Sequence, residues 1–230
     1  MLLSQEDHER VRAAVDAAET RTCGEIVCVL ARECSEYWEV PLAWAIGVAL
    51  IVPAAAFLLG LRPEAIAALG PAWTSAQAAA VEPTVGQALA TYAVVQGVLF
   101  IVTACLASVP AVRRALTPGA LKREHVHRRA VEQFSARAYH LTPDETGVLV
   151  FASLAERRAV VLADSGVASR VAPGEWSKVV DALVKGMGAK DPAGGFVNAI
   201  HQAADILAEH CPRRPGDVNR LPDTVIELEF

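Results

Sequence analysis

Two long apolar segments without a charged residue dominate this chain of 230 residues. The first, residues 40–61, has 22 positions, and the second, residues 88–112, has 25. Because a helix rises about 1.5 Å per residue, about 20 apolar residues cross the ~30 Å hydrocarbon core of a bilayer. Soluble helices rarely remain apolar on every face over such a length. The sequence therefore predicts two transmembrane helices, residues 38–62 and 88–112, joined by a loop of residues 63–87.

Basic residues around these segments predict how the chain lies across the membrane. Residues 113–132 contain six arginines and lysines, whereas residues 62–87 contain only Arg62. Since basic flanking residues stay in the cytoplasm, the chain that follows the second helix is expected there. Two spans return the chain to its starting side. Both termini are therefore predicted to be cytoplasmic, and the protein to be multi-pass.

The remaining residues, 1–37 and 113–211, carry the periodicities of one α/β core, followed by an extended tail of residues 212–230. Strand 25–31 is apolar on both alternating faces, which is typical of a strand covered on both sides. The expected elements are, in order, helix 4–20, strand 25–31, helix 117–139, strands 147–153 and 158–164 joined by a turn at 154–157, and helices over 176–187 and 196–207.

Strand 25–31 has no partner within its own segment, and an isolated strand leaves its edges unpaired. We therefore expect it to join the later hairpin in one sheet, parallel to strand 147–153, with the membrane helices inserted in the crossover. The turn 154–157 then lies at the sheet end from which the chain enters the membrane. Arginines would gather near anionic head groups there, each contributing about 1 kcal/mol: Arg32, Arg113, Arg114, Arg157 and Arg158.

The opposite end of the predicted sheet collects carboxylates. Glu25, Asp144 and Asp164, with Glu145 beside them, are expected in its loops. Several carboxylate oxygens are what a hard cation needs, because Ca²⁺ takes about 6–8 oxygens and Mg²⁺ about six. The sequence thus predicts a divalent cation site, for Ca²⁺ or Mg²⁺, at Glu25, Asp144 and Asp164, although no cofactor is required. The alternatives are an exposed charge at Glu25, a turn cap at Asp144 and a strand end at Asp164.

The helix 117–139 has one strongly basic face, which favours a solvated or lipid-facing surface. Two histidines two positions apart, His125 and His127, point to different sides of a helix and do not form a metal pair. His127 is predicted at the edge of the core. The expected apolar face comprises His127, Ala130, Val131, Phe134 and Ala138.

Several stretches resemble the TPM domain family, and in particular a bacterial membrane branch in which a helical hairpin interrupts the domain. They are residues 22–27 (TCGEIV), 144–150 (DETGVLV), 154–158 (LAERR), the Asp164 loop and Trp176, within a resemblance that covers about residues 4–210. It implies a three-layer α/β/α sandwich around a small mixed sheet and location in the bacterial inner membrane. Studied members include proposed acid phosphatases and metal-binding factors in photosystem repair.

The loop after the third strand decides between the functional hypotheses. The family usually has a Gly-rich loop with Tyr and Glu there, whereas residues 164–168 read DSGVA. The leading hypothesis is therefore a non-catalytic module that binds a partner protein or lipid head groups. The rival is a metal-dependent phosphatase that uses Glu25, Asp144 and Asp164. The formal net charge of −5 argues against nucleic-acid binding, and the oligomeric state is left open.

Overall fold

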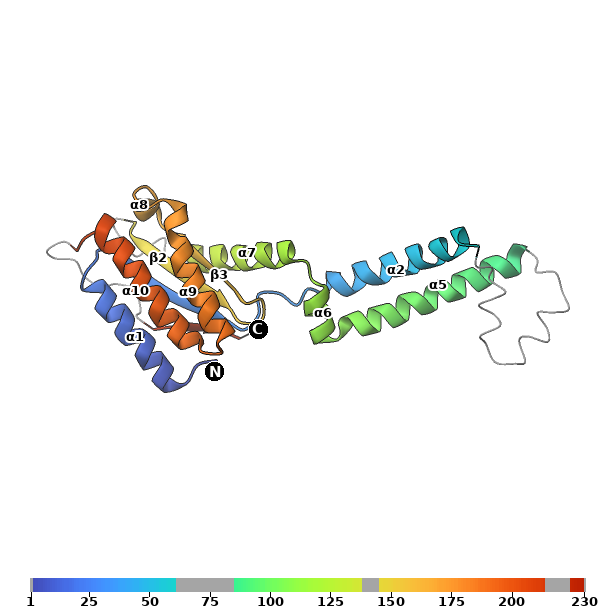
Figure 1. The fold of residues 1–230 in the computed structure, drawn as a ribbon, viewed down its shortest axis with the longest axis horizontal. Helices are drawn as coiled ribbons and strands as arrows, with labels where there is room; N and C mark the ends of the chain where they lie inside the picture. The colour runs from blue at the N-terminus through green and yellow to red at the C-terminus, as the bar shows by residue number, and fades with distance from the viewer. Residues whose placement is uncertain (1, 61–84, 138–144, 214–223, 230) are drawn as a thin grey trace. The chain divides into compact units, whose positions relative to one another are not determined.

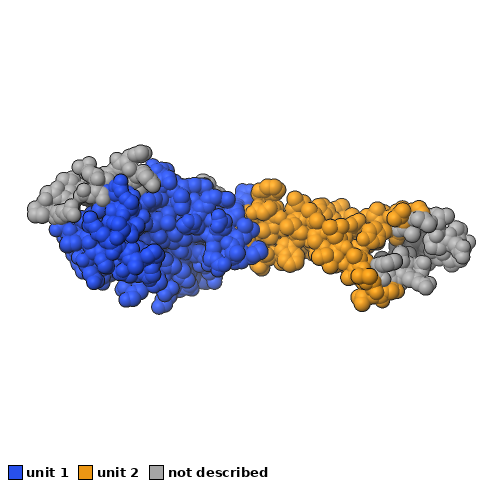
Figure 2. Space-filling model, turned by 90° about the horizontal axis from the view of Figure 1, so that it is seen from above, with its two compact units in different colours: residues 1–36, 118–230 blue, residues 37–117 orange. Residues whose placement is uncertain are grey.

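The computed structural model describes residues 2–60, 85–137, 145–213 and 224–229. The chain forms two compact units, coloured separately in Figure 2. Unit 1 comprises Met1–Glu36 and Pro118–Phe230, and unit 2 comprises Tyr37–Thr117. Residues 63–84 of the expected loop, together with Ala138 and Asp144, lie outside the described residues.

The described part of unit 2 forms three helices, α2 (Glu39–Leu58), α5 (Val85–Ser108) and the short α6 (Pro110–Leu116). The helices α2 and α5 lie side by side and run in opposite directions (Figure 1). Both are long and apolar enough to cross a membrane. Only 28% of the apolar window in α2 and 0% of that in α5 is buried. A helix in a soluble core would be mostly buried, so these exposed apolar surfaces fit contact with lipid.

Unit 1 is built on a mixed sheet of four strands in the order β3-β2-β1-β4. Strand β1 (Glu25–Ala31) lies parallel to β2 (Gly147–Ser153) and to β4 (Ile226–Leu228), and β2 is antiparallel to β3 (Arg158–Ala163). The predicted parallel pair and the hairpin are both confirmed. All seven residues of β1 are buried, because apolar clusters cover both faces of this strand.

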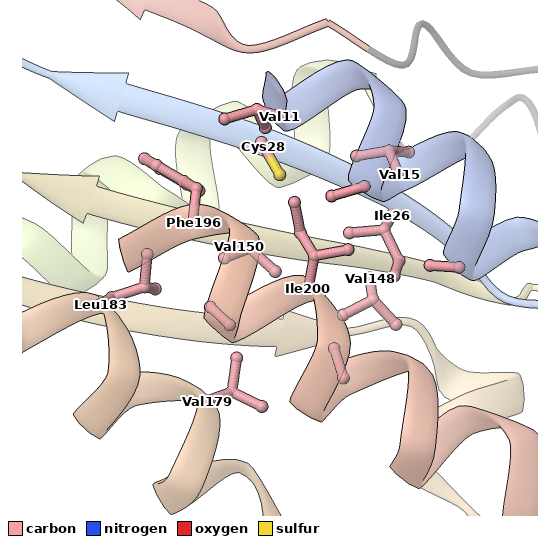
Figure 3. Close-up of a cluster of buried hydrophobic side chains, with 14 of the residues drawn as sticks. Val11, Val15, Ile26, Cys28, Val148, Val150, Val179, Leu183, Phe196 and Ile200 are labelled. Carbon is pink, nitrogen blue, oxygen red and sulfur yellow. The ribbon is translucent and has the colours of Figure 1, made fainter. Parts of the chain in front are cut away.

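One face of the sheet packs against α1 (Gln5–Glu19), α9 (Ser177–Gly188) and α10 (Pro192–His210). Figure 3 shows apolar side chains from the helices directed towards those of β1 and β2. The expected start of α1 is confirmed, since Ser4 and Asp7 form a reciprocal capping box. Between β3 and α9 the chain forms the short helix α8 (Ser165–Ala168) and the 3₁₀ turn η1 (Pro173–Trp176).

The other face of the sheet packs against α7 (Gly119–Arg137), and two residues of the predicted apolar face, Ala130 and Phe134, are confirmed in this contact. The buried stripe is Val126, Ala130 and Phe134, at spacings of four residues. His127 is exposed, and Val131 is 40% exposed, so the prediction that both face the core is wrong. Each lies one position after a buried residue, and one position turns the helix by about 100°.

The C-terminal tail contributes a strand that the sequence did not predict. β4 extends the sheet beside β1 over three residues. The carboxylate of Glu227 accepts hydrogen bonds from the backbone N–H groups of Leu2, at 2.7 Å, and Leu3, at 2.8 Å, and lies 2.9 Å from Nε2 of His8. The two ends of the chain are thereby joined at one edge of unit 1.

Candidate functional site

Two predicted carboxylates, Glu25 and Asp164, lie at the same end of the sheet, on either side of Gly147. Glu25 is paired with Gly147 in the parallel ladder, and the N–H of Asp164 donates to the Gly147 carbonyl at 2.9 Å. Two strand spacings place their backbones about 10 Å apart. Glu25 is only 9% exposed and Asp164 only 6%. The alternative that Glu25 is an exposed charge is therefore wrong.

Asp164 directly follows β3 and caps the N-terminus of α8. Its Oδ1 accepts a hydrogen bond from the N–H of Ser165 at 2.7 Å, which satisfies a free donor at the helix start. The hydroxyl of Ser165 donates to the carboxylate of Glu145, and the Glu145 carbonyl accepts from the N–H of Gly166. Glu145 has a φ of 54°, in the left-handed region. These bonds give Asp164 and Glu145 structural roles in holding two loops together.

The predicted cation site stays a prediction. Among the described residues, no group of three histidine, cysteine or carboxylate side chains is arranged to hold a metal ion. Asp144, the expected third ligand, lies outside them. Glu25 and Asp164 alone supply too few oxygens for Ca²⁺ or Mg²⁺, so a cation site here would need at least one further protein ligand.

The opposite end of unit 1 contains a groove of about 480 Å³. It lies between α7, the turn joining β2 to β3, the first residues of β3, and α9. We call it the basic groove, because its polar lining comprises Arg123, His127, Arg157 and Arg158 together with Glu156. Val160, Val180 and Val184 form part of its apolar wall.

The arginines of the basic groove have no acidic partner in the described part of the chain. Arg123 and Arg157 are exposed, and neither makes an ion pair or a hydrogen bond to a described side chain. Arg158 is half-buried, and its Nε is a buried donor without an acceptor among the described residues. Its Nη2 lies against Gly119 at the start of α7, 3.3 Å from where a Cβ would stand. The Nε itself is closed to solvent, and the guanidinium makes no ion pair among the described residues, so its outer amino groups are the donors left for an anion in the groove.

Glu156, the acidic residue in the groove lining, has both carboxylate oxygens hydrogen-bonded to residues inside unit 1. One carboxylate oxygen accepts from the Ser153 hydroxyl, and the other accepts from the N–H of Cys34 at 3.2 Å. Glu156 is 8% exposed and Ser153 0%. These bonds hold the turn against the end of β1, and they leave the arginines on the open side of the groove.

Cys34, beside this turn, is not a reactive thiol. Burial raises its pKa to about 12; nearby Glu156 and Glu33 act in the same direction, whereas a hydrogen bond with Ser153 and the charge of Arg129 act in the opposite one. The thiol is therefore neutral at physiological pH, and the nucleophilic thiolate is absent. Ser153, which is fully buried, has no access to a substrate.

Sequence reasoning identified part of the basic groove. Arg157 and Arg158 were expected at this end of the sheet, and the structure places both there. Arg123 was expected only as one of many charges on a basic helix face, and His127 was assigned to the core edge. The useful signal is the stripe of Val126, Ala130 and Phe134, because it turns Arg123 and His127 towards the groove.

A second groove, of about 560 Å³, lies between α9 and α10. Its lining includes Lys178 and Lys185 as well as Asp181 and Asp191, so it carries both signs of charge. The two helices meet closely at its base through glycines. A Cβ on Gly186 would lie 2.3 Å from the Cα of Gly195.

Comparison with known proteins gives a likeness of fold. No family model matches the chain, and no curated protein matches it. The NMR structure of the BA42 protein from the psychrophilic bacterium Bizionia argentinensis is similar, with a TM-score of 0.54. The two sequences are 16% identical, and the match covers 98% of this chain and 94% of that one. At such low identity the likeness concerns the fold alone.

Proposed function

We propose that this chain is an integral protein of the bacterial inner membrane whose unit 1 is a TPM-like domain that binds lipid head groups. In this proposal α2 and α5 cross the bilayer, and both termini lie in the cytoplasm. The exposed apolar surfaces of the two helices support the membrane assignment. The apolar clusters on both faces of the sheet support the three-layer α/β/α arrangement of that domain.

The basic groove is the observation that carries the binding function. Three guanidinium groups line one groove without an acidic partner among the described residues. Arginine is the side chain best suited to phosphate, because its planar donors can bind two oxygens at once. The groove favours binding over nucleophilic catalysis at this place, since the Ser153 hydroxyl beside it is buried and the Cys34 thiol is neutral.

The length of the connecting chain supports a lipid ligand rather than a protein partner. The groove lies at the end of the sheet where β1 finishes, since the N–H of Leu154 donates to the carbonyl of Ala31. Residues 32–38 then lead into α2, and even fully extended they span no more than about 25 Å. If α2 crosses the bilayer, that end of the sheet stays within reach of the head groups.

The test is hydrogen–deuterium exchange on the full chain reconstituted in liposomes. One set of liposomes contains only zwitterionic lipid, and the other contains anionic lipid as well. We expect slower exchange over residues 154–160 and the start of α7 in anionic liposomes, and a loss of the difference at high salt. Arg157→Gln with Arg158→Gln should abolish the difference. Equal exchange in both liposomes would refute head-group binding, and a protein partner would become the better explanation.

The topology needs its own measurement. Reporter domains fused to either terminus should be active only in the cytoplasm, and alkaline carbonate should leave the protein in the membrane fraction. A reporter active on the outer side, or recovery in the aqueous fraction without detergent, would overturn the membrane assignment.

A metal-dependent phosphatase is the second candidate function. It is favoured by the burial of Glu25 and Asp164 at one end of the sheet, since neighbouring carboxylates can bind a cation or act as acid and base. The assay is hydrolysis of a phosphomonoester by the full chain with and without Ca²⁺ or Mg²⁺. Activity that depends on the metal and is lost in Asp144→Asn and in Asp164→Asn would establish this function. Asparagine still caps a helix, so the second variant should keep the fold.

A further inference from the structure

We infer that the basic groove is a discrete site for one phosphomonoester group, with Arg158 as its inner ligand. The inference rests on the proposed function in taking a head group as the ligand, and it narrows that ligand to one chemical class. A discrete site differs from a diffuse basic surface because it binds one molecule at saturation and depends on particular residues.

The donor groups are arranged as a phosphate site requires. Arg158 is half-buried in the groove wall and makes no ion pair among the described residues, and its outer amino groups would donate to a phosphate oxygen, because its Nε is closed to solvent. Arg123, from α7, and Arg157, from the turn, are exposed at the rim of the same groove. Their side chains come from two separate elements, so they can close on further oxygens of the same phosphate.

The balance of charge favours a monoester over a diester. The lining carries three arginines against the single carboxylate of Glu156, which is already bound to Ser153 and to the N–H of Cys34. A phosphomonoester carries about −1.5 to −2 charge at neutral pH, since its second pKa is about 6. A phosphodiester carries a single negative charge and would leave more of the positive charge unbalanced.

The apolar wall of the groove indicates where the carbon atoms esterified to the phosphate would lie. Val184 is 38% exposed, and Val180 and Val160 are half-buried beside it. The groove, at about 480 Å³, is within the usual range for small-molecule sites, about 300–1,000 Å³. A phosphomonoester lipid such as phosphatidic acid would place its glycerol carbons against these valines. A soluble phosphomonoester would share the phosphate contacts and lack the apolar ones.

Isothermal titration calorimetry on the full chain in an uncharged, phosphate-free detergent tests the site. The probes are glycerol 3-phosphate, short-chain phosphatidic acid and short-chain phosphatidylglycerol, which is a diester. We expect one molecule bound per chain, with phosphatidic acid tighter than glycerol 3-phosphate and phosphatidylglycerol weakest. Equal affinity for phosphatidic acid and glycerol 3-phosphate would assign the site to a soluble ligand instead of a lipid.

Matched variants separate the groove from general basic charge. Arg158→Gln and Arg123→Gln should each weaken phosphatidic acid binding about tenfold or more. Arg128→Gln is the control, because Arg128 lies on the same helix outside the groove, with its Nη2 3.2 Å from Nδ1 of His125. It should change the affinity less than about twofold. Val184→Ser should weaken phosphatidic acid binding and leave glycerol 3-phosphate binding unchanged.

The outcomes distinguish this inference from the proposed function. If the Arg123 and Arg158 variants bind like the Arg128 control, or if no phosphomonoester binds the wild-type chain, the discrete site is refuted, even when anionic liposomes still slow hydrogen exchange. If the soluble phosphomonoester binds in the groove while exchange is equal in both liposomes, the site stands and the head-group function fails. Arg123 is exposed on α7, so its variant should fold and give a decisive result even if Arg158→Gln does not.

Discussion

The contact between α9 and α10 allows a sharply controlled test of the fold, through Gly186→Ala. A Cβ at this position would lie 2.3 Å from the Cα of Gly195, 2.7 Å from its N, and 2.9 Å from the carbonyl oxygen of Asp191. All three are backbone atoms, which cannot rotate away as a flexible side chain would. Because carbon atoms normally approach to about 3.5–4.0 Å, the two helices would have to separate by more than about 1 Å.

The expected cost follows from two opposing terms. Overpacking costs about 1–3 kcal/mol, and the separation of two core helices places this case at the upper end. Replacing glycine by alanine inside a helix returns up to about 1 kcal/mol. The net destabilisation is therefore about 1–2 kcal/mol. A domain of this size loses about 2–4 °C of melting temperature per kcal/mol, so the expected decrease is about 2–8 °C.

Two further glycines serve as graded controls. A Cβ on Gly188, also in α9, meets nothing within 4 Å, so Gly188→Ala should not lower the melting temperature. A Cβ on Gly195 approaches the Cα of Gly186 to only 3.0 Å, so Gly195→Ala should lie between the two. The assay is thermal unfolding of the full chain in detergent, followed by circular dichroism. If Gly186→Ala melted at or above the temperature of Gly188→Ala, the described helix contact would be wrong.

Further predictions concern single residues of unit 1. Val126→Ala should destabilise the protein by about 2 kcal/mol and His127→Ala by no more than about 0.5 kcal/mol in chemical denaturation; equal effects would contradict the orientation of α7. Burial alone would raise the pKa of Glu227, but hydrogen bonds from two N–H groups and from a histidine lower it below its ordinary value of 4.5. The stabilisation that ionised Glu227 provides is therefore present above pH 4.5 and is lost as pH falls through the lowered pKa. The melting temperature of wild type should exceed that of Glu227→Gln at neutral pH, and this advantage should vanish in acid. A difference that stayed constant with pH would refute this linkage. Asp164→Ala should lose about 0.5–2 kcal/mol of helix capping, and Asp164→Asn should retain most of it; equal losses would argue against the cap. Alkylation of Cys34, followed by mass spectrometry, should keep accelerating above pH 9, since its pKa is about 12; a plateau near neutral pH would contradict this.

The sequence predicted most elements of unit 1 because their signals are local. Three signals depend on residues close together in the chain, and all three are confirmed: the continuous apolar run of strand 25–31, the capping residues Ser4 and Asp7, and the turn at 154–157. The parallel pairing of β1 with β2 also followed, since a strand isolated by an insertion must find its neighbour elsewhere. The strand β4 did not follow, because three residues carry too little periodicity to be recognised.

The candidate site was harder to predict than the fold. The sequence of α7 allows more than one choice of buried face. Whether Val126 or His127 occupies the core position depends on the sheet against which the helix packs. That choice also decides whether Arg123 lines the basic groove. The burial of Glu25 likewise depends on how distant elements pack around the start of β1, which no local pattern records.

The sequence alone determined that two apolar helices interrupt an α/β core, because length and hydrophobicity along the chain fix what each segment can bury. Only the tertiary structure decided that Arg123 meets Arg157 and Arg158 in one groove. Arg123 lies more than thirty positions before the other two, in an element whose orientation relative to theirs is set by side-chain packing. Local periodicity records which face of an element is apolar, whereas the meeting of charged groups depends on how distant elements pack together.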